Sequence, residues 1–134
     1  MSAFAFGRDR RIRSRADFVR VQKHGAAVRT AHFILLVARG AAGPARLGVV
    51  AARSTGGAVV RNRIKRLCRE CFRLAPGLVP AGIDLVVIAK AGAGDLGLRD
   101  VQREWSGAST RLRAQCEKVL QAGPSSPHSS GSGT

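Results

Sequence analysis

Basic side chains gather on one face of a predicted helix in the middle of this sequence. Residues 56–73 read GGAVVRNRIKRLCRECFR. At about 100° per residue, the apolar residues of this segment fall on one side: Val60, Ile64, Leu67, Cys68, Cys71 and Phe72. The opposite side carries Asn62, Lys65, Arg66, Arg69 and Arg73, with Arg61 and Arg63 at its borders. The pattern predicts an amphipathic helix with a core face and a basic face.

The like charges on the basic face repel one another along the helix. Arg61, Lys65, Arg69 and Arg73 follow at i,i+4 spacing, and only Glu70 dilutes them. Like charges at that spacing destabilise a helix by about a few tenths of a kcal/mol per pair. An external polyanion would relieve the repulsion, and the planar guanidinium group of arginine binds phosphate bidentately and stacks on bases. RNA or DNA is therefore the predicted partner.

The whole chain is strongly basic. It has 134 residues and a formal net charge of +15, which is enough chain for one domain with one core. Such a charge predicts binding to nucleic acid or to an anionic membrane surface. No apolar run reaches the roughly 18 residues that span a bilayer, and no apolar stretch follows the N-terminal arginines as in a secretory signal. We therefore expect a cytoplasmic protein without a membrane partner.

The acidic and histidine residues do not form a catalytic pattern. A two-metal nuclease needs converging carboxylates, whereas the acids here are spread singly: Asp9, Asp17, Glu70, Asp84, Asp95, Asp100, Glu104 and Glu117. A metal-free ribonuclease needs a pair of histidines or a histidine with a lysine, and His24, His32 and His128 are scattered. We therefore predict no catalytic residue and no metal ligand in the chain.

Two further groups have structural explanations. The pair Cys68 and Cys71 has zinc-site spacing, but no second pair completes the four ligands of a structural zinc site. Because both residues belong to the apolar side, we predict buried, reduced core cysteines. Asp84 begins an apolar run, and we expect its carboxylate to bind backbone donors or an arginine.

The basic helix lies within a series of predicted elements. A first helix begins near Ser14, whose hydroxyl can cap it, and ends at Gly25. Strands are predicted at 28–38 and 46–52 and are expected to pair as an antiparallel hairpin. Ser54 and Thr55 are candidate caps of the basic helix, which we expect to end near Leu74.

The second half of the chain continues the α+β pattern. A buried strand is predicted at 83–90 and a helix at 98–120 that Gly107 interrupts. Residues 1–10 have the composition of a flexible basic arm, and 123–134 that of a disordered tail. We therefore predict a single domain over 11–122.

Several segments together resemble the protein component of bacterial ribonuclease P. The central match resembles the RNR signature of that family and consists of Gly56, Ala58-Val59, Arg61-Asn62-Arg63-Ile64-Lys65-Arg66 and Arg69-Glu70. The flanking matches occur in the same order: Arg11-Ile12, Asp17-Phe18, Lys23-His24-Gly25, Phe33, Arg46-Leu47-Gly48, Asp84 and Lys90. The resemblance covers nearly all of the chain outside its first residues and its tail.

The resemblance implies a fold and a function. The fold is an α-β-β-β-α-β-α two-layer sandwich like the second domain of ribosomal protein S5, with a short strand near 26–29 and a left-handed βαβ crossover. The function is that of an accessory subunit in a ribonucleoprotein endonuclease. This enzyme removes the 5′ leader of precursor tRNA by hydrolysis that uses Mg²⁺, bound mainly by the RNA, and its catalytic groups belong to the RNA.

The resemblance also implies which residues contact RNA. The catalytic RNA partner is expected at Arg53, Arg61, Asn62, Arg63, Lys65, Arg66 and Arg69, and the charge pattern adds Arg11 and Arg73. The leader of precursor tRNA is expected in a cleft beside the sheet, at Phe18, Gln22 and Leu36.

The sequence departs from the family pattern at several of these positions. Arg53-Ser54 replaces a usual pair of lysines, and Gly57 replaces a usual asparagine. Gln22 and Leu36 stand where the family often has aromatic residues, so base stacking in the cleft should be weak and phosphate contacts should carry more of the affinity.

Two other functions share part of this pattern. A general or ribosomal RNA-binding protein with no role in tRNA cleavage would have the same charge, but it would not need the whole RNR signature. A basic helix on a membrane surface would need its apolar face for lipid, whereas the strands and the second helix here require that face for the core.

Overall fold

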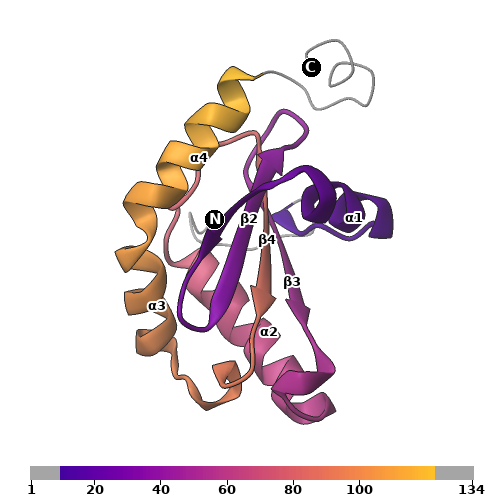
Figure 1. Ribbon diagram of the computed structural model, residues 1–134, viewed down its shortest axis with the longest axis vertical. Helices are drawn as coiled ribbons and strands as arrows, with labels where there is room; N and C mark the ends of the chain where they lie inside the picture. Colours follow the sequence, from indigo (N-terminus) through magenta and orange to yellow (C-terminus); the bar gives the residue numbers. More distant parts are fainter. Residues whose placement is uncertain (1–9, 123–134) are drawn as a thin grey trace, which may run out of the picture.

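The computed structural model describes residues 10–122. Residues 1–9 of the expected arm and the expected tail at 123–134 lie outside the described part. The elements follow in the order α1 (Arg15–His24), β1 (Ala26–Arg29), β2 (Phe33–Arg39), β3 (Arg46–Ala51), α2 (Ala58–Arg73), β4 (Ile83–Ala89), α3 (Leu98–Gly107) and α4 (Ser109–Gln121). Figure 1 shows α2, α3 and α4 gathered along one side of a twisted sheet and α1 on the other side. The predicted α+β fold is confirmed.

The strands form one sheet in the order β1-β2-β4-β3. β2 pairs antiparallel with β1 and with β4, whereas β3 pairs with β4 in parallel. The predicted hairpin between the segments 28–38 and 46–52 is therefore wrong. Nearly all of β4 is buried, so this apolar strand takes the central position and separates β2 from β3. The first of those predicted segments contains two strands, and β1 is the short strand that the family resemblance implied.

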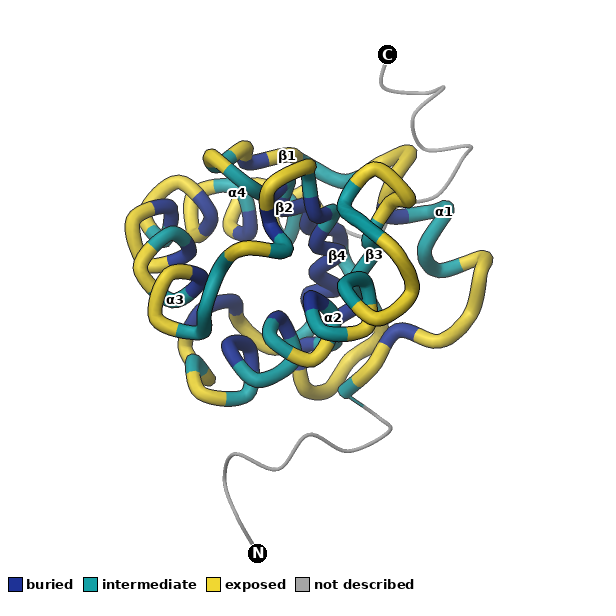
Figure 2. Tube along the Cα trace, turned by 90° about the horizontal axis from the view of Figure 1, so that it is seen from below, coloured by how far each residue is buried: buried dark blue, intermediate teal, exposed yellow. Residues whose placement is uncertain are grey.

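The two faces of the sheet bury different clusters. Phe33, Leu35 and Val37 of β2 belong to the main core with α2, α3 and α4. Leu36 and Ala38 alternate with them and belong to a smaller cluster on the opposite face, which also contains residues of α1. Figure 2 shows this arrangement along the strands, with α2, α3 and α4 on one side of the sheet. In both views the path from β3 through α2 to β4 has the left-handed sense expected from the resemblance.

The helix ends agree only partly with the predicted caps. Ser14 caps α1, since its Oγ accepts a hydrogen bond from the Asp17 N–H at 3.2 Å. Gly57 is the N-cap of α2 and supplies no side-chain bond. The prediction of Ser54 or Thr55 as cap is therefore wrong. The Thr55 hydroxyl instead donates to the Ala52 carbonyl at 2.6 Å and closes a 3-10 turn before the helix.

The long C-terminal helical segment is divided at Gly107, where α3 ends before α4 begins. Trp105 of α3 is buried against Phe33, with ring centroids 5.8 Å apart and ring planes at 83°. This edge-to-face pair fixes α3 on the sheet. Cys68, Cys71 and Cys116 are free and buried, as predicted for the first two. Among residues 10–122, no helix is both long and apolar enough to cross a membrane.

Candidate nucleic-acid interface

Helix α2 separates a core face from a basic face, as its sequence predicted. Ile64, Cys68, Cys71 and Phe72 are buried against the sheet. On the other side, Asn62 and Arg66 are exposed, and the predicted contacts Arg61, Lys65, Arg69 and Arg73 are partly exposed. Because the apolar face is fixed in the core, the basic face has one orientation, toward solvent.

Arg69 and Arg11 bring positive charges from distant parts of the chain together. Residue 11 forms a parallel bridge with Leu47 at the edge of β3. Burial lowers the pKa of Arg69, and the nearby charge of Arg11 lowers it further. The pKa shift shows that Arg11 and Arg69 repel one another, and a phosphate placed near both would relieve that repulsion. The structure therefore places Arg11 beside the predicted surface.

Arg63 has a different environment from its neighbours on α2. Its Nη1 donates to the Gly94 carbonyl at 2.7 Å, and its Nη2 donates to the Leu96 carbonyl at 2.8 Å. These bonds join the first half of α2 to the loop before α3. The guanidinium group of Arg63 therefore supports the shape of the surface, which the sequence motif alone did not indicate.

Arg73 is paired on its own helix. Its Nε donates to Glu70 Oε1 at 3.0 Å, and its Nη2 donates to the other carboxylate oxygen. This hydrogen bonding lowers the pKa of Glu70 and raises that of Arg73. Since Glu70 offsets its charge, Arg73 contributes less to the positive potential of the surface than Lys65 or Arg66.

The beginning of α2 supplies the remaining predicted positions. Arg53 is exposed in the 3-10 turn that precedes the helix. Arg61 is partly buried, and its Nε has no hydrogen-bond partner within the described part of the chain. The basic surface therefore extends from this turn along α2, with Lys65 and Arg66 at its centre.

The residues predicted for the leader cleft belong to α1 and to the opposite face of the sheet. Phe18 packs into the small cluster that includes Leu36, while Gln22 is exposed one turn further along α1. A β-carbon at Gly48 would lie only 2.6 Å from the Phe18 ring. The glycine therefore provides the space in which Phe18 lies against the sheet.

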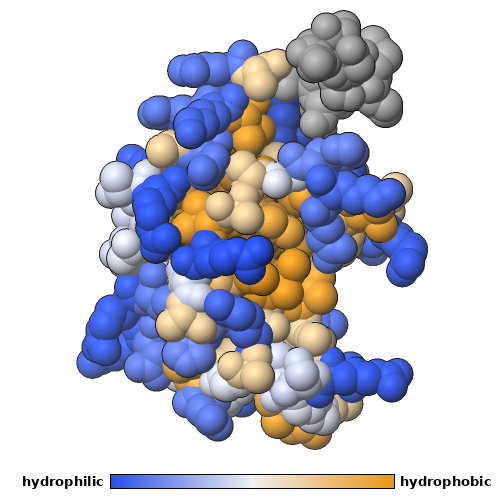
Figure 3. Space-filling model, viewed as in Figure 1, coloured by the Kyte–Doolittle hydropathy of each residue, from blue (hydrophilic) through white to orange (hydrophobic). Residues whose placement is uncertain are grey.

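A row of apolar residues on this face was missed by the sequence interpretation. Ile34, Ile88 and Val50 are directly paired across β2, β4 and β3, and each remains partly exposed. Figure 3 shows an apolar area over the middle of the sheet, framed by hydrophilic side chains. The period-two alternation within the strands indicates these positions, but only once the strand order is known. They form a shallow apolar floor next to Phe18.

A buried ion pair holds α1 over the same face. Arg46 Nε and Nη2 donate to the two oxygens of Asp84 at 2.9 and 2.7 Å, and Arg20 of α1 donates to the same carboxylate. The hydrogen bond with Asp84 raises the pKa of Arg46. Asp17 supports both arginines at 3.4 to 3.5 Å. The expectation that Asp84 binds an arginine is confirmed, and its role is to position α1.

Several acidic side chains and His32 have structural contacts, and the cysteines are buried. Within residues 10–122, no group of three or more His, Cys, Asp or Glu side chains is placed to hold a metal ion. Glu104 accepts hydrogen bonds from Thr30 and from the backbone N–H of His32, and it lies 2.8 Å from His32 Nδ1. Burial raises the pKa of Cys68 and Cys71 to about 12, so both thiols are protonated and unreactive at neutral pH.

Comparison with known proteins identifies the family. The sequence profile described as Ribonuclease P matches residues 6–113. The ribonuclease P protein component of Geotalea uraniireducens is 36% identical over 113 residues, which cover 84% of this chain and 98% of that protein. The component from Syntrophus aciditrophicus is 38% identical over 104 residues, covering 78% and 87% of the two chains.

Solved structures agree in fold as well as in sequence. The Staphylococcus aureus RNase P protein superposes with a TM-score of 0.70 at 30% identity, over 79% of this chain and 97% of that one. The Thermotoga maritima protein superposes with a TM-score of 0.67 at 31% identity, over 75% and 96%. Together with the basic face of α2 and its signature residues, these matches show that the chain belongs to the ribonuclease P protein component family.

Proposed function

We propose that the basic face of α2 binds the catalytic RNA of ribonuclease P, the enzyme of which this chain is a protein subunit. The observation that carries the proposal is the orientation of α2. Its apolar side is buried in the core, while Asn62, Lys65 and Arg66 lie on the outward side. Neither Lys65 nor Arg66 forms an ion pair within residues 10–122. Arg53 and Arg11 extend the positive surface on either side. A polyanion is the partner that this charge favours.

We propose that the open face of the sheet binds the 5′ leader of precursor tRNA. The floor of Ile34, Ile88 and Val50 is apolar and has no aromatic residue, so bases would lie against aliphatic side chains beside Phe18. Aliphatic contacts discriminate weakly between bases because they make no base-specific hydrogen bond. The leader preference should accordingly be slight, and the charges around the floor should supply much of the affinity.

The chemistry of cleavage is assigned to the RNA partner in this proposal. The RNA would hold Mg²⁺, which would supply activation of the attacking water and stabilisation of the departing 3′ oxygen of the leader. The residues of this chain would bind and orient the two RNAs so that the cleavage site lies near that metal. We further propose that the subunit acts in the cytoplasm, with precursor tRNA and without a membrane partner.

Precursor-tRNA cleavage at near-physiological Mg²⁺ tests this proposal. Three samples are compared: the protein alone, a bacterial ribonuclease P RNA alone, and the two mixed. We expect efficient formation of mature 5′ ends only in the mixture. Cleavage by the protein alone would place catalytic groups on the chain, and an RNA activity unchanged by the protein would leave a general RNA-binding protein as the better description.

A further inference from the structure

The two edge strands of the sheet, β3 and β1, differ in how much of their outer backbone is covered. Along β3, the segment just before α1 covers the edge, since the Ile12 N–H donates to the Leu47 carbonyl at 2.9 Å. β1 is the other edge, and its single strand neighbour in the described chain is β2. An uncovered edge offers backbone donors and acceptors to an added strand.

The register of β1 shows which backbone groups point outward. The Thr30 N–H donates to the Phe33 carbonyl at 2.8 Å, so this pair is hydrogen-bonded. Hydrogen-bonded pairs alternate along an antiparallel ladder. Ala27 and Arg29 therefore direct their N–H and C=O groups away from β2. The Arg29 carbonyl accepts a bond from Arg111 of α4 at 3.3 Å, which agrees with that direction.

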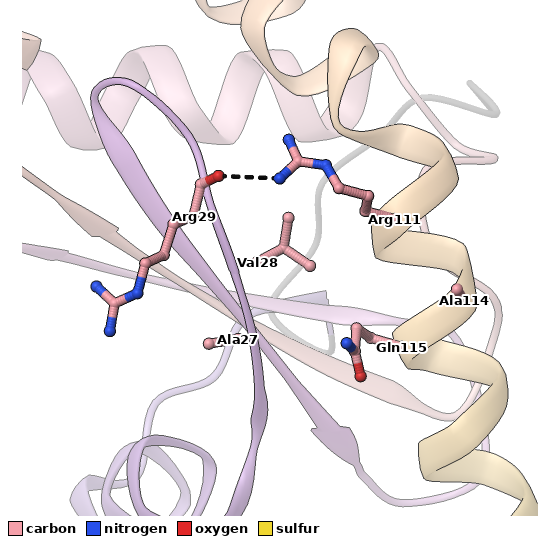
Figure 4. Close-up of a pocket in the computed structure, with 6 residues that line it drawn as sticks. All are labelled: Ala27, Val28, Arg29, Arg111, Ala114 and Gln115. Atoms are coloured by element: carbon pink, nitrogen blue, oxygen red, sulfur yellow. Dashed lines mark hydrogen bonds between the residues drawn. The ribbon is translucent and has the colours of Figure 1, made fainter.

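A hollow lies between this edge and α4. Its volume is about 360 Å³, and its lining consists of Ala27, Val28, Arg29, Arg111, Ala114 and Gln115. In Figure 4 Val28 points toward α4, and Gln115 and Arg111 project from α4 toward the strand. The lining contains small and apolar groups near the strand, polar groups along α4 and no carboxylate. A groove of this kind, between an edge strand and a helix, suits an extended peptide.

We propose that an extended segment of another protein, carrying an acidic side chain, docks in this groove as an additional strand on β1. Its backbone would pair with the outward groups of Ala27 and Arg29. Its carboxylate would bind Arg111, whose bond to the Arg29 carbonyl is long at 3.3 Å and exposed. Arg111 can therefore exchange this weak hydrogen bond for a stronger one to the carboxylate of the peptide.

Charge argues against three other occupants of the groove. A second copy of this chain would bring its own Arg29 and Arg111 against the same residues. Residues 123–134 contain two prolines and no acidic side chain, so their sequence lacks the side-chain carboxylate that Arg111 would bind. An RNA phosphate would need converging cations, whereas the Arg29 side chain in Figure 4 points away from Arg111, and phosphates cannot donate to the outward carbonyls.

Fluorescence anisotropy with the full chain tests the proposal. The probe is a labelled, capped peptide Glu-Val-Thr-Val-Glu, and the control peptide has lysine in place of both glutamates. We expect saturable binding of the acidic peptide only. Ala27→Pro removes an outward N–H, and Arg111→Glu reverses the charge on α4. Each should weaken binding at least tenfold, while Arg113→Glu on another side of α4 should leave it within twofold.

Two controls keep the result interpretable. A peptide N-methylated at both valines tests strand pairing without changing the protein, and its binding should be lost. Arg111→Glu leaves the backbone intact, so it reports even if Ala27→Pro lowers the thermal midpoint. Binding that is equal in Ala27→Pro, or absent in the unchanged protein, overturns the proposal. If Arg111→Glu instead weakens binding of a single-stranded RNA, the groove belongs to RNA.

Discussion

At the scale of single residues, the buried carboxylate of Asp84 has a large energetic consequence. Its side chain is 2% exposed and accepts hydrogen bonds from Arg20 and Arg46. Removing one partner of a buried ion pair leaves charges without compensation and costs about 3–5 kcal/mol. We expect Asp84→Ala to lower the free energy of unfolding by about that amount in urea denaturation.

Asp17 provides the comparison for this prediction. Its side chain is 32% exposed, and its contacts with Arg20 and Arg46 are 3.5 and 3.4 Å long. Exposed pairs of this kind contribute at most about 1 kcal/mol. An Asp84→Ala variant no less stable than Asp17→Ala would show that the ion pair does not hold α1 on the sheet.

Glu104 connects stability to pH. Burial raises its pKa, but hydrogen bonds from Thr30 and from the side chain and backbone of His32 outweigh burial, so the pKa lies below its ordinary value. A lowered carboxylate pKa stabilises the fold above the pKa of the unfolded chain, about 4.3. That stabilisation is lost as pH falls through the folded pKa.

The expected result follows from this sign. The free energy of unfolding of Glu104→Gln should be lower than that of the unchanged protein above about pH 5, and the difference should shrink below about pH 4. Denaturation curves at several pH values measure it. Glu117→Gln makes the same chemical change at an exposed site of α4. If the free energies of unfolding of Glu104→Gln and of the unchanged protein differ as much at low pH as at neutral pH, the role of the Glu104 carboxylate is contradicted.

At the scale of elements, α2 contains two arginines with opposite predicted effects. Arg66 is exposed on the basic face, so Arg66→Gln should weaken RNA binding and reduce the slope of log K against log salt by about 0.7 to 0.9. Its free energy of unfolding should change by less than about 0.5 kcal/mol, as is usual for surface substitutions.

Arg63→Gln makes the same change one turn earlier on the helix. It removes the bonds to the Gly94 and Leu96 carbonyls, and hydrogen bonds from a charged group contribute about 1.5–3 kcal/mol each. Thermal unfolding should therefore show clear destabilisation of Arg63→Gln. If the stability of Arg63→Gln is unchanged and its slope of log K against log salt falls as in Arg66→Gln, then Arg63 contacts RNA and does not stabilise the loop.

The sequence predicted the elements better than their pairing. The periodicity of 56–73 located α2 and its two faces, and Ser14 and Gly107 marked helix ends correctly. The hairpin prediction failed because adjacency in sequence was taken as adjacency in space, whereas the central strand β4 comes later in the chain. Arg63 binds a loop 31 residues away, and Ile34, Ile88 and Val50 form a row across three strands. Both features depend on tertiary structure, which no local sequence pattern contains.

At the scale of the whole molecule, net charge opposes compactness. A formal charge of +15 on 134 residues creates self-repulsion that a bound polyanion relieves. A ligand that binds only the folded state at about 100 times its Kd stabilises that state by about 2.7 kcal/mol. We expect the thermal midpoint to rise by several degrees on adding ribonuclease P RNA at low salt.

The rise should fall as salt increases, since screening weakens both the repulsion and the binding. A neutral polymer of similar mass is the control and should leave the midpoint unchanged within about 1 °C, because crowding acts weakly. A midpoint that is the same with and without RNA at low salt would show that the folded chain does not bind this polyanion.

The strand order also fixes the sequence of events during translation. β3 pairs only with β4 among the named strands, and β4 follows α2 in the chain. At about 5–20 residues per second, a few seconds pass between synthesis of β3 and synthesis of its partner. During that interval the nascent chain has already exposed its arginine-rich helix, but it lacks the strand that completes the core beneath it. The emerging polypeptide therefore carries the positive charges of α2 before it has a fold to present them.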